Sequence, residues 1–413
     1  MDRAIAASAL RCSDRTIEVA PDGGNEVRSS RAQPLHRIAL FSGNFNCVRD
    51  GANRALNRLV SHSLDRGHAV RVYSPTVREP AFAPAGDLVS VPSWPVPLRP
   101  EYRFAARLPS IHAADVQRFQ PSVIHVSAPD GLGAAAIRMA RRIGVPVVAS
   151  VHTRFETYLD YYGLGGLRGA TEAWLRRFYA KCDAVLAPSD AFAKELSQIG
   201  IEATHVWSRG VDTTEFNPAF RDMDWRRRLD IADDEIALLF FGRLVAEKGL
   251  ATFEATASAL REKGVSIRPL IVGDGPERRR LAKHLPNAVF TGQLDGAALG
   301  RAVASADIFL NPSLTEAFGN VTLEAMASGV AVIAAETPIN RVLIESGRTG
   351  LLTSPNSPER YAEATHRLVA NGLERQAIAS AAVTRARTFE WAKTLDIVLE
   401  AYRGVWAAHS LRP

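Results

Sequence analysis

Two glutamates, Glu316 and Glu324, stand on either side of a predicted helix start. Glu316 falls in a loop after the apolar, strand-like run 306–310, and Gly319 and Asn320 then begin a helix. The first N–H groups of a helix have no partners within it, and they lie at the positive end of the helix dipole. The sequence therefore predicts a phosphate-binding helix terminus, with Glu324 roughly 7 Å further along the chain at 1.5 Å per residue.

Both carboxylates have the chemistry to hold a sugar nucleotide. An ionised carboxylate only accepts hydrogen bonds, so it takes them from two adjacent hydroxyl groups at once, which a ribose or a hexose offers. We expect Glu316 to hold a hexose and Glu324 a ribose. In the structural alternative, Glu324 is an exposed helix residue and Glu316 is a charge that complements the helix dipole.

A second segment supplies positive charge. The buried-strand pattern 238–241 runs into a loop that holds Arg243 and Lys248 between Gly242 and Gly249. Arg offers a planar fork of N–H donors and Lys a point charge, and both stabilise a diphosphate that leaves a sugar. We expect these two cations to bind a diphosphate; as isolated residues they would be solvated surface charges.

These segments resemble the motifs of a known family. Residues 311–329, which include Phe318 and Gly319, are similar to the glutamate, seven residues, glutamate motif of the retaining glycosyltransferases of family 4. Residues 242–249 resemble that family's G-R-x-x-x-x-K-G signature, and the resemblance covers most residues from about 37 to 395. It implies the α/β fold called GT-B, in which two Rossmann-like domains face each other across a cleft.

The resemblance also implies which residues form the site. The residues expected near the reacting sugar are His152, Arg243, Lys248 and Glu316. Those expected to bind the rest of the donor are Gly43, Arg209, Gly242, Phe318, Gly319, Asn320, Val321 and Glu324. The departing diphosphate would be stabilised by the two cations and the helix terminus, so we expect no metal ion and no cofactor.

The positions of His152 and Arg209 rest on this resemblance. His152 follows the predicted strand 147–151, where family members carry a histidine close to the donor sugar, although a lone histidine there is more often structural. Arg209 stands where many relatives have Asn, so its cation would meet an acidic donor sugar or reinforce the phosphate site. The loop 43–54 would cover the diphosphate or admit the acceptor, with Gly51 allowing close backbone approach.

Other segments bear on the acceptor. Residues 207–218 look most like the branch that contains plant-type sulfolipid synthases and bacterial lipid-linked α-mannosyl or glucuronosyl transferases. The aromatic, glycine-containing segment 158–167 suits an acceptor lid or a lipid-facing loop, and core packing is an equally good account. The basic amphipathic stretch 168–181 is compatible with an anionic membrane surface, but we favour a helix that packs its aromatic face inward.

Length and composition indicate two domains and argue against a structural zinc site, nucleic-acid binding and a membrane-spanning helix. The 413 residues, 46% of them hydrophobic, suffice for two α/β domains. The three cysteines have neither C-x-x-C nor zinc-ligand spacing. The net charge of +6 allows anionic partners, but the sequence has no nucleic-acid-binding signature. No apolar run approaches the ~20 residues of a membrane-spanning helix, so we expect a cytoplasmic protein, soluble or peripheral at the inner face of the membrane.

Two short motifs favour turns over ligand sites. Gly273-Asp274-Gly275-Pro276 is typical of a strand-to-helix turn, which the family resemblance implies lies near the nucleotide, and it lacks the spacing of a redox dinucleotide fingerprint. The acidic pair in residues 222–224 lies in a charged helix-like stretch, which favours a solvated face over a metal site.

Two series of alternating strands and helices predict the domains. We expect a disordered leader over 1–34, an acceptor-side domain over 35–207 and a nucleotide-sugar-binding domain over 208–390. The family resemblance implies that a terminal helix over 391–413 crosses back to the first domain. The predicted strands are 37–41, 69–73, 123–126, 147–151 and 184–187 in the first domain, and 237–241, 270–272, 288–290, 308–310 and 330–334 in the second.

We therefore predict a retaining α-glycosyltransferase that moves a hexose from a nucleoside diphosphate to an acceptor hydroxyl. UDP is favoured over GDP, and a lipid or glycolipid over a soluble glycan. The alternatives are a nucleotide-sugar epimerase of the same fold and a non-catalytic protein that binds sugar nucleotides.

Overall fold

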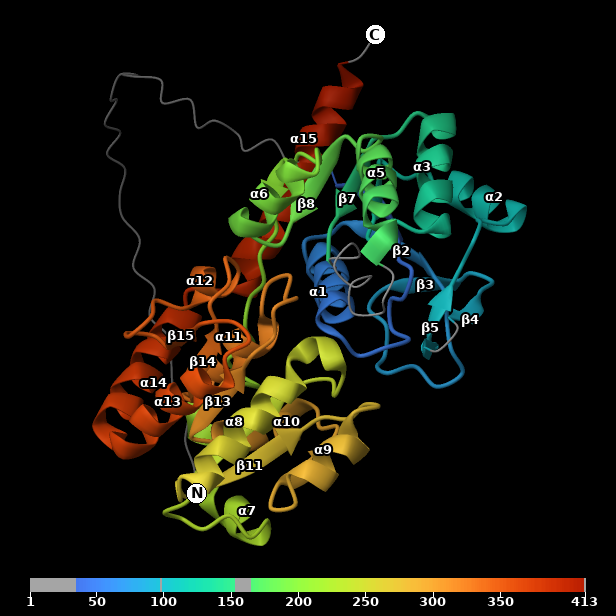
Figure 1. Cartoon of the computed structure of the whole chain (residues 1–413). Coiled ribbons are helices and arrows are strands. Elements are labelled where there is room, and N and C mark those ends of the chain that lie inside the picture. Colours follow the sequence, from blue (N-terminus) through green and yellow to red (C-terminus); the bar gives the residue numbers. More distant parts are fainter. Residues whose placement is uncertain (1–34, 97–98, 153–164, 412–413) are drawn as a thin grey trace, which may run out of the picture. The chain divides into compact units, whose positions relative to one another are not determined.

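The computed structural model describes residues 35–96, 99–152 and 165–411 (Figure 1). The predicted leader over 1–34 and residues 158–164 of the aromatic segment lie outside this part of the chain.

The first sheet is built from the N-terminal half of the chain. Its strand order is β3-β2-β1-β6-β7-β8-β9, and all neighbouring strands are parallel. Its strands are β1 (Arg37–Phe41), β2 (Ala69–Ser74), β3 (Asp87–Ser90), β6 (Val123–Val126), β7 (Val147–Ser150), β8 (Ala184–Ala187) and β9 (His205–Val206). Strands covered on both faces are apolar throughout, which explains why most of them were predicted correctly.

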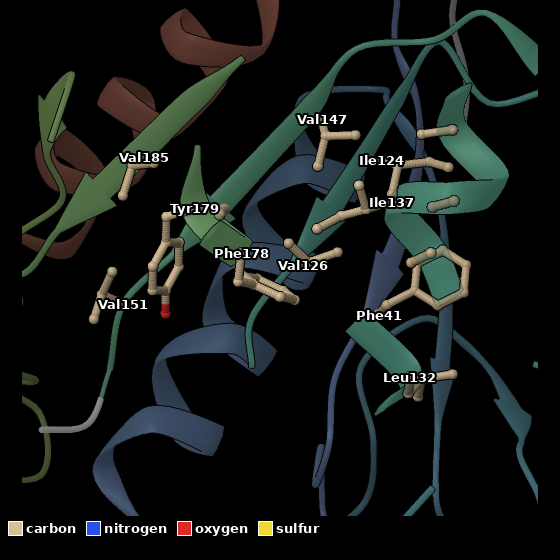
Figure 2. Packing of buried hydrophobic residues seen from close by; sticks show 14 of the residues in the cluster. Phe41, Ile124, Val126, Leu132, Ile137, Val147, Val151, Phe178, Tyr179 and Val185 are labelled. Atoms are coloured by element: carbon tan, nitrogen blue, oxygen red, sulfur yellow. The ribbon is translucent and has the colours of Figure 1, made fainter. Parts of the chain in front are cut away.

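Helices cover both faces of this sheet. Ile38 and Leu40 of β1 pack with one set of helices, whereas Ala39 and Phe41 pack with the other, because side chains alternate along a strand. The first set is α1 (Gly51–Asp65) and α15 (Trp391–Ser410). The second is α2 (Ser110–Phe119), α3 (Gly131–Ile143), α5 (Arg168–Tyr179) and α6 (Asp190–Gln198). Figure 2 shows the core under the second set, where Phe178 of α5 lies near the β6 and β7 side chains.

The second sheet is also parallel throughout. Its strand order is β12-β11-β10-β13-β14-β15. Its strands are β10 (Ile236–Phe241), β11 (Ile267–Val272), β12 (Val289–Gly292), β13 (Ile308–Asn311), β14 (Ala331–Ala335) and β15 (Leu351–Thr353). The surrounding α-helices are α7 (Met223–Arg228), α8 (Leu250–Glu262), α9 (Arg278–His284), α10 (Gly296–Ala304), α11 (Asn320–Ala327), α12 (Asn340–Leu343), α13 (Pro358–Ala370) and α14 (Gly372–Ala386). Short 3₁₀ turns are η1 (Gly165–Leu167), η2 (Pro218–Phe220) and η3 (Ala246–Lys248).

Several elements were not predicted from the sequence. β3, β9 and β15 are short strands, and an antiparallel pair, β4 (Trp94–Val96) with β5 (Arg99–Phe104), follows β3. Their sequences lack a long apolar run, so pairing with neighbours decides their conformation. The predicted loop 43–54 was too long, because α1 begins at Gly51, where the Asp50 side chain accepts a hydrogen bond from the Asn53 backbone at 2.8 Å.

The terminal helix returns to the first sheet. α15 lies against β7, β8 and β9 and against α1 (Figure 1). Leu395, Val398 and Tyr402 are buried there with the β1 side chains.

A buried ion pair supports the second sheet below β13. Arg226 is fully buried and donates to Asp307 Oδ2 at 2.7 Å and to the backbone carbonyl of Ser305. Of the acidic pair in 222–224, Asp222 caps α7 by accepting from the Trp225 backbone, and Asp224 pairs with a neighbouring arginine. These contacts account for both carboxylates as helix-end groups.

Among the described helices, none has the length and apolar character that crossing a bilayer requires.

Candidate active site

The expected site residues follow the carboxyl ends of the parallel strands. His152 follows β7 in the first sheet, while Gly242 follows β10 and Glu316 comes after β13 in the second. Loops at this edge of parallel sheets are where such folds bind ligands.

Lys248 and Glu316 form an ion pair. Lys248 Nζ lies 2.7 Å from Glu316 Oε1, and both side chains are largely shielded from water. The sequence predicted both residues as ligands of different parts of one donor, and the structure brings them into contact across 68 residues. A bound diphosphate and hexose would compete with this pair for its charges.

The loop that carries Arg243 and Lys248 packs tightly against the Gly273–Pro276 turn. A Cβ atom added at Gly273 would lie 1.9 Å from the backbone oxygen of Gly242, so the backbones leave no room for a side chain. The turn also holds the loop through the Leu244 backbone N–H, which donates to the Asp274 carbonyl at 2.9 Å. The glycines of this turn therefore allow the close packing of the two loops, which the sequence did not predict.

Arg243 points toward residues of the β5 strand. Its Nη1 donates to the Tyr102 hydroxyl at 2.7 Å, and its Nη2 lies 3.4 Å from Glu101 Oε1. The Tyr102 hydroxyl in turn donates to Asp50 at 3.4 Å, at the start of α1. Burial raises the pKa of Asp50, whereas the Asn53 backbone N–H and the Arg243 charge oppose that rise. Arg243 is thus linked to the N-terminus of α1 through Tyr102.

The helix start predicted at Gly319 and Asn320 is confirmed. Gly319 has φ = 93° and no side chain caps α11, so the first N–H groups are not occupied by a cap. Phe318 is buried and packs edge-on against Phe389, with ring centroids 6.1 Å apart. These contacts fix the direction in which α11 begins.

The N-termini of α11 and α1 come together. A Cβ atom added at Gly51 would lie 2.1 Å from Asn320 Nδ2, so a side chain there would make the Asn320 amide turn away. Val321, the next residue of α11, is half-buried. Two positive helix ends at one place favour an anionic ligand.

Glu324 is held by an arginine of α1. Arg54 Nη2 lies 2.9 Å from Glu215 Oε2, and Arg54 Nη1 lies 3.5 Å from Glu324 Oε1. Burial raises the pKa of Glu324 to about 7, and the neighbouring Glu215 adds to that rise while Arg54 and Arg58 oppose it. The Glu324 carboxyl is therefore close to half-protonated at neutral pH.

A second α1 arginine reaches the segment that joins the two sheets. Arg58 Nη2 lies 2.7 Å from Asp212 Oδ2. Burial raises the pKa of Asp212, but hydrogen bonds from Thr214 and Arg58 prevail and lower it to about 2. The Asp212 carboxylate is therefore ionised at neutral pH in this ion pair.

His152 and Arg209 contact each other. Arg209 Nη2 donates to His152 Nδ1 at 2.8 Å, and Arg209 also donates to the backbone carbonyls of Trp207 and Ser208. Its guanidinium lies over the Trp207 ring, 4.7 Å from the ring centroid. Burial lowers the pKa of Arg209 to about 10, which still leaves it a cation at neutral pH.

Gly43 lies beside another carboxylate. A Cβ atom added at Gly43 would lie 2.6 Å from Asp130 Oδ2, and Asp130 Oδ1 accepts from the Gly133 backbone at 2.7 Å as the cap of α3. Burial raises the pKa of Asp130 to about 6. In the described structure, Gly43 thus makes room for the cap of α3.

Sequence reasoning missed the α1 arginines and Tyr102. Arg54 and Arg58 are four residues apart on one helix, a spacing that places both on one face, and this was the available signal. Nothing near Tyr102 in the sequence indicated contact with Arg243, because 141 residues separate them.

Comparison with known proteins places this geometry in a family. Residues 49–215 match the family model described as Glycosyltransferase Family 4, and residues 235–371 match that of Glycosyl transferases group 1. The chain is 34% identical over 385 residues to a GDP-mannose-dependent alpha-mannosyltransferase of Mycolicibacterium smegmatis, which covers 91% of this chain and 99% of that protein. The chain belongs to glycosyltransferase family 4.

Other relatives agree with this assignment. The chain is 31% identical over 412 residues to the sulfoquinovosyl transferase SQD2 of Arabidopsis thaliana, covering 95% of this chain and 80% of that protein. Its fold is similar to that of sucrose-phosphate synthase from Thermosynechococcus elongatus, with a TM-score of 0.76 at 21% identity over 90% of this chain and 100% of the other. This family 4 glycosyltransferase thus has the GT-B fold, and it uses nucleotide-sugar donors.

Proposed function

We propose that this chain is a retaining α-mannosyltransferase that transfers mannose from GDP-mannose to a hydroxyl group of a membrane glycolipid. The proposal is carried by the 34% identity to a GDP-mannose-dependent alpha-mannosyltransferase over nearly the whole of both chains. The sequence alone favoured UDP over GDP; the similarity to this relative favours GDP instead.

The proposed donor site assigns a part of the nucleotide sugar to each charged group. The diphosphate binds Arg243, Lys248 and the N-terminus of α11, while Glu316 holds hydroxyls of the mannose and Glu324 those of the ribose. Support comes from the 2.7 Å contact between Lys248 and Glu316, because the diphosphate and the sugar of the donor are bonded to each other, so the proposed ligands of both must lie close together. His152 and Arg209 complete the site on the side of the first sheet.

The proposed reaction needs no protein nucleophile. The acceptor hydroxyl attacks the anomeric carbon on the face from which the diphosphate departs, the bond between that carbon and the phosphate oxygen breaks, and the departing phosphate oxygen takes the acceptor proton. Arg243 and Lys248 stabilise the negative charge that develops on the diphosphate. Because protein cations and a helix terminus supply this stabilisation, we expect activity that is independent of added metal ions.

Exposed basic residues of α5 support a lipid acceptor. Arg168, Arg176 and Arg177 are exposed, and Trp174 and Leu167 beside them are exposed apolar side chains. Cations next to exposed aromatic and aliphatic groups suit a surface of anionic lipid. The same helix buries Leu175, Phe178 and Tyr179, so the favoured core packing and a lipid contact use different side chains of α5.

The proposed division of the chain follows the two sheets. We keep 35–207 as the acceptor-side domain and 208–390 as the donor-side domain, with the terminal helix returning to the first. Support comes from β9, which ends at Val206 in the first sheet, and from α15, which packs on β7, β8 and β9.

A donor panel followed by product analysis tests the proposal. GDP-mannose should raise the melting temperature of the full chain more than UDP-glucose, UDP-galactose or ADP-glucose, and Glu316→Gln should reduce that rise. Radiolabelled mannose should then enter a bacterial lipid extract as an α-glycoside, with equal rates in EDTA. A shift with UDP-sugars alone would make UDP the donor nucleotide, a β-linked product would refute retention, and isomerised donor without a glycoside would favour the epimerase.

A further inference from the structure

Five polar side chains form one continuous chain of hydrogen bonds beside the proposed site. Arg209 Nη2 lies 2.8 Å from His152 Nδ1, and His152 Nε2 lies 2.7 Å from Ser150 Oγ. Ser150 Oγ also lies 2.7 Å from His125 Nε2, and His125 Nδ1 lies 2.7 Å from the Tyr402 hydroxyl. The chain therefore runs from the segment between the sheets, through β7 and β6, to α15.

The strand pattern explains how these residues meet. Neighbouring apolar residues of β6 and β7 alternate between the two cores, and Val123 and Val148 lie on the face covered by α15. His125 and Ser150 are two residues further along their strands, so they lie on that same face. Tyr402 projects from α15 onto this face. Packing of the terminal helix on the first sheet is thus what completes the chain.

Because these side chains are buried, the loss of any hydrogen bond between them is costly in free energy. His125 and Tyr402 are fully buried, Ser150 is 1% exposed, and Arg209 is 4% exposed. A buried donor or acceptor that loses its partner is not rescued by solvent, and the loss costs about 1–3 kcal/mol. Each member must therefore match its neighbour, with a donor facing an acceptor at every contact.

The direction of two hydrogen bonds follows from Arg209. A guanidinium only donates, so Arg209 donates and His152 Nδ1 accepts. A neutral His152 then carries its proton on Nε2 and donates to Ser150. The Ser150 oxygen either donates its one proton to His125 Nε2 or accepts a second hydrogen bond from it, so His125 either donates from Nδ1 to Tyr402 or accepts there from the Tyr402 hydroxyl. Both arrangements give His152 the same tautomer.

The chain leaves His152 no free ring nitrogen. Among the described residues, the charged or titratable groups that face it are Arg209 and His125, with the Trp207 ring edge-on at a centroid distance of 5.3 Å. A proton added at Nδ1 would place a cation against the Arg209 guanidinium. Burial, Arg209 and His125 together hold the pKa of His152 well below its ordinary range. His152 is therefore built to hold Arg209 and is poorly suited to exchange protons.

We propose that Ser150, His125 and Tyr402 are positioning residues, which lock His152 as its Nε2–H tautomer so that Nδ1 holds the Arg209 guanidinium at the active site. The active-site location of His152 and Arg209 rests on the proposed function, whereas the tautomer rests on the hydrogen-bond geometry alone. The active-site location and the tautomer can therefore be tested by separate experiments.

The tautomer is measured directly in the full chain. Long-range ¹H–¹⁵N correlation of protein labelled with ¹⁵N-histidine distinguishes Nε2–H from Nδ1–H imidazole and detects protonation, and His152→Gln assigns the signal. We expect His152 to be the Nε2–H tautomer, and neither His152 nor His125 to titrate between pH 5.5 and 8.5. A His152 that titrates in this range, or that carries its proton on Nδ1, would overturn the proposal.

Variants then test the role in catalysis. Ser150→Ala removes both hydrogen bonds at the centre of the chain, whereas Ser150→Thr retains a hydroxyl and should keep the wild-type tautomer. Ser63→Ala is the matched control, because Ser63 is a buried serine that donates only to the Leu59 carbonyl of its own helix. Ser150→Ala should lower kcat/KM by about tenfold or more, since the loss of even one buried hydrogen bond has an effect of about this size.

The pH profile separates positioning from general loss of structure. In Ser150→Ala, the Nε2–H of His152 loses its acceptor, so the ring can turn away from Arg209, one of the groups that lower its pKa. His152 should then titrate nearer its ordinary pKa of about 6.5, and kcat/KM should gain an acidic limb that the wild type, Ser150→Thr and Ser63→Ala lack. An unchanged profile in Ser150→Ala would refute the positioning role. If Ser150→Ala fails to fold, the wild-type tautomer and the Tyr402→Phe profile decide, since that variant removes only the terminal hydroxyl. If the chain transfers no sugar at all, the tautomers still test the hydrogen-bond chain, and only the proposed function fails.

Discussion

Donor binding should depend on pH through Glu324. The carboxylate must be ionised to accept hydrogen bonds from both ribose hydroxyls, and its pKa in the donor-free protein is about 7. Below that value the proton must leave before the donor binds, so affinity falls as pH falls. The apparent Kd rises by a factor of 1 + 10^(pKa − pH), which is about 11 at pH 6 and about 1.1 at pH 8. We predict roughly tenfold weaker binding at pH 6, about 1.4 kcal/mol.

The assay is calorimetric titration of GDP-mannose at pH 6, 7 and 8. The sugar nucleotide is preferable to GDP, because a terminal phosphate has a second ionisation near pH 6 that would mimic the effect, whereas both phosphates of GDP-mannose are esterified. Glu324→Gln should bind more weakly at pH 8 and show no dependence on pH. A wild-type Kd that changes by less than about twofold between pH 6 and pH 8, or a slope retained in Glu324→Gln, would refute the reasoning.

The contact between Arg54 and Glu324 allows a second test of this prediction. Arg54 lies 3.5 Å from Glu324 and lowers its pKa, while Glu215 raises it. Arg54→Met keeps much of the aliphatic stem and removes the charge, so the loss of affinity should begin at higher pH than in the wild type. A profile that moves to lower pH would mean that Arg54 does not stabilise the Glu324 carboxylate.

Three further predictions concern single residues. Gly51→Ala places a methyl group 2.1 Å from Asn320 Nδ2; because the amide can turn away, we expect the donor KM to rise about tenfold with a melting temperature within about 2 °C of the wild type, and a normal KM would contradict this. Arg226→Met removes a fully buried cation from its carboxylate partner, which should cost about 3–5 kcal/mol and lower the melting temperature by about 6 °C or more, measured by calorimetry. Lys248→Ala should lower kcat by about two orders of magnitude without unfolding the chain, whereas the exposed control Lys263→Ala should leave it unchanged; wild-type turnover in Lys248→Ala would refute the diphosphate assignment.

The local sequence determined the two sheets and the helix terminus of the site. Runs such as 238–241 are apolar throughout, because parallel strands are covered on both faces, so the second series of strands was predictable without tertiary information. A glycine at position 319 likewise indicates the start of α11. Its φ is 93° in the structure, and few other residues adopt that conformation. Short strands such as β15 and the β4–β5 pair were missed, because pairing with neighbours rather than intrinsic preference holds them.

Only the tertiary structure decided which charges meet. The sequence predicted Glu324 as a ribose ligand, but not that Arg54 of the first sheet's helix α1 lies beside it or that burial raises its pKa. It presents His152 as a lone histidine, whereas folding surrounds the ring with Arg209 and Ser150 and, through His125, with the terminal helix. Side-chain identity and spacing along the chain predict which chemistry is available. Protonation and partner choice depend on groups distant in sequence and on the exclusion of water, and these arise only when the two sheets and α15 pack together.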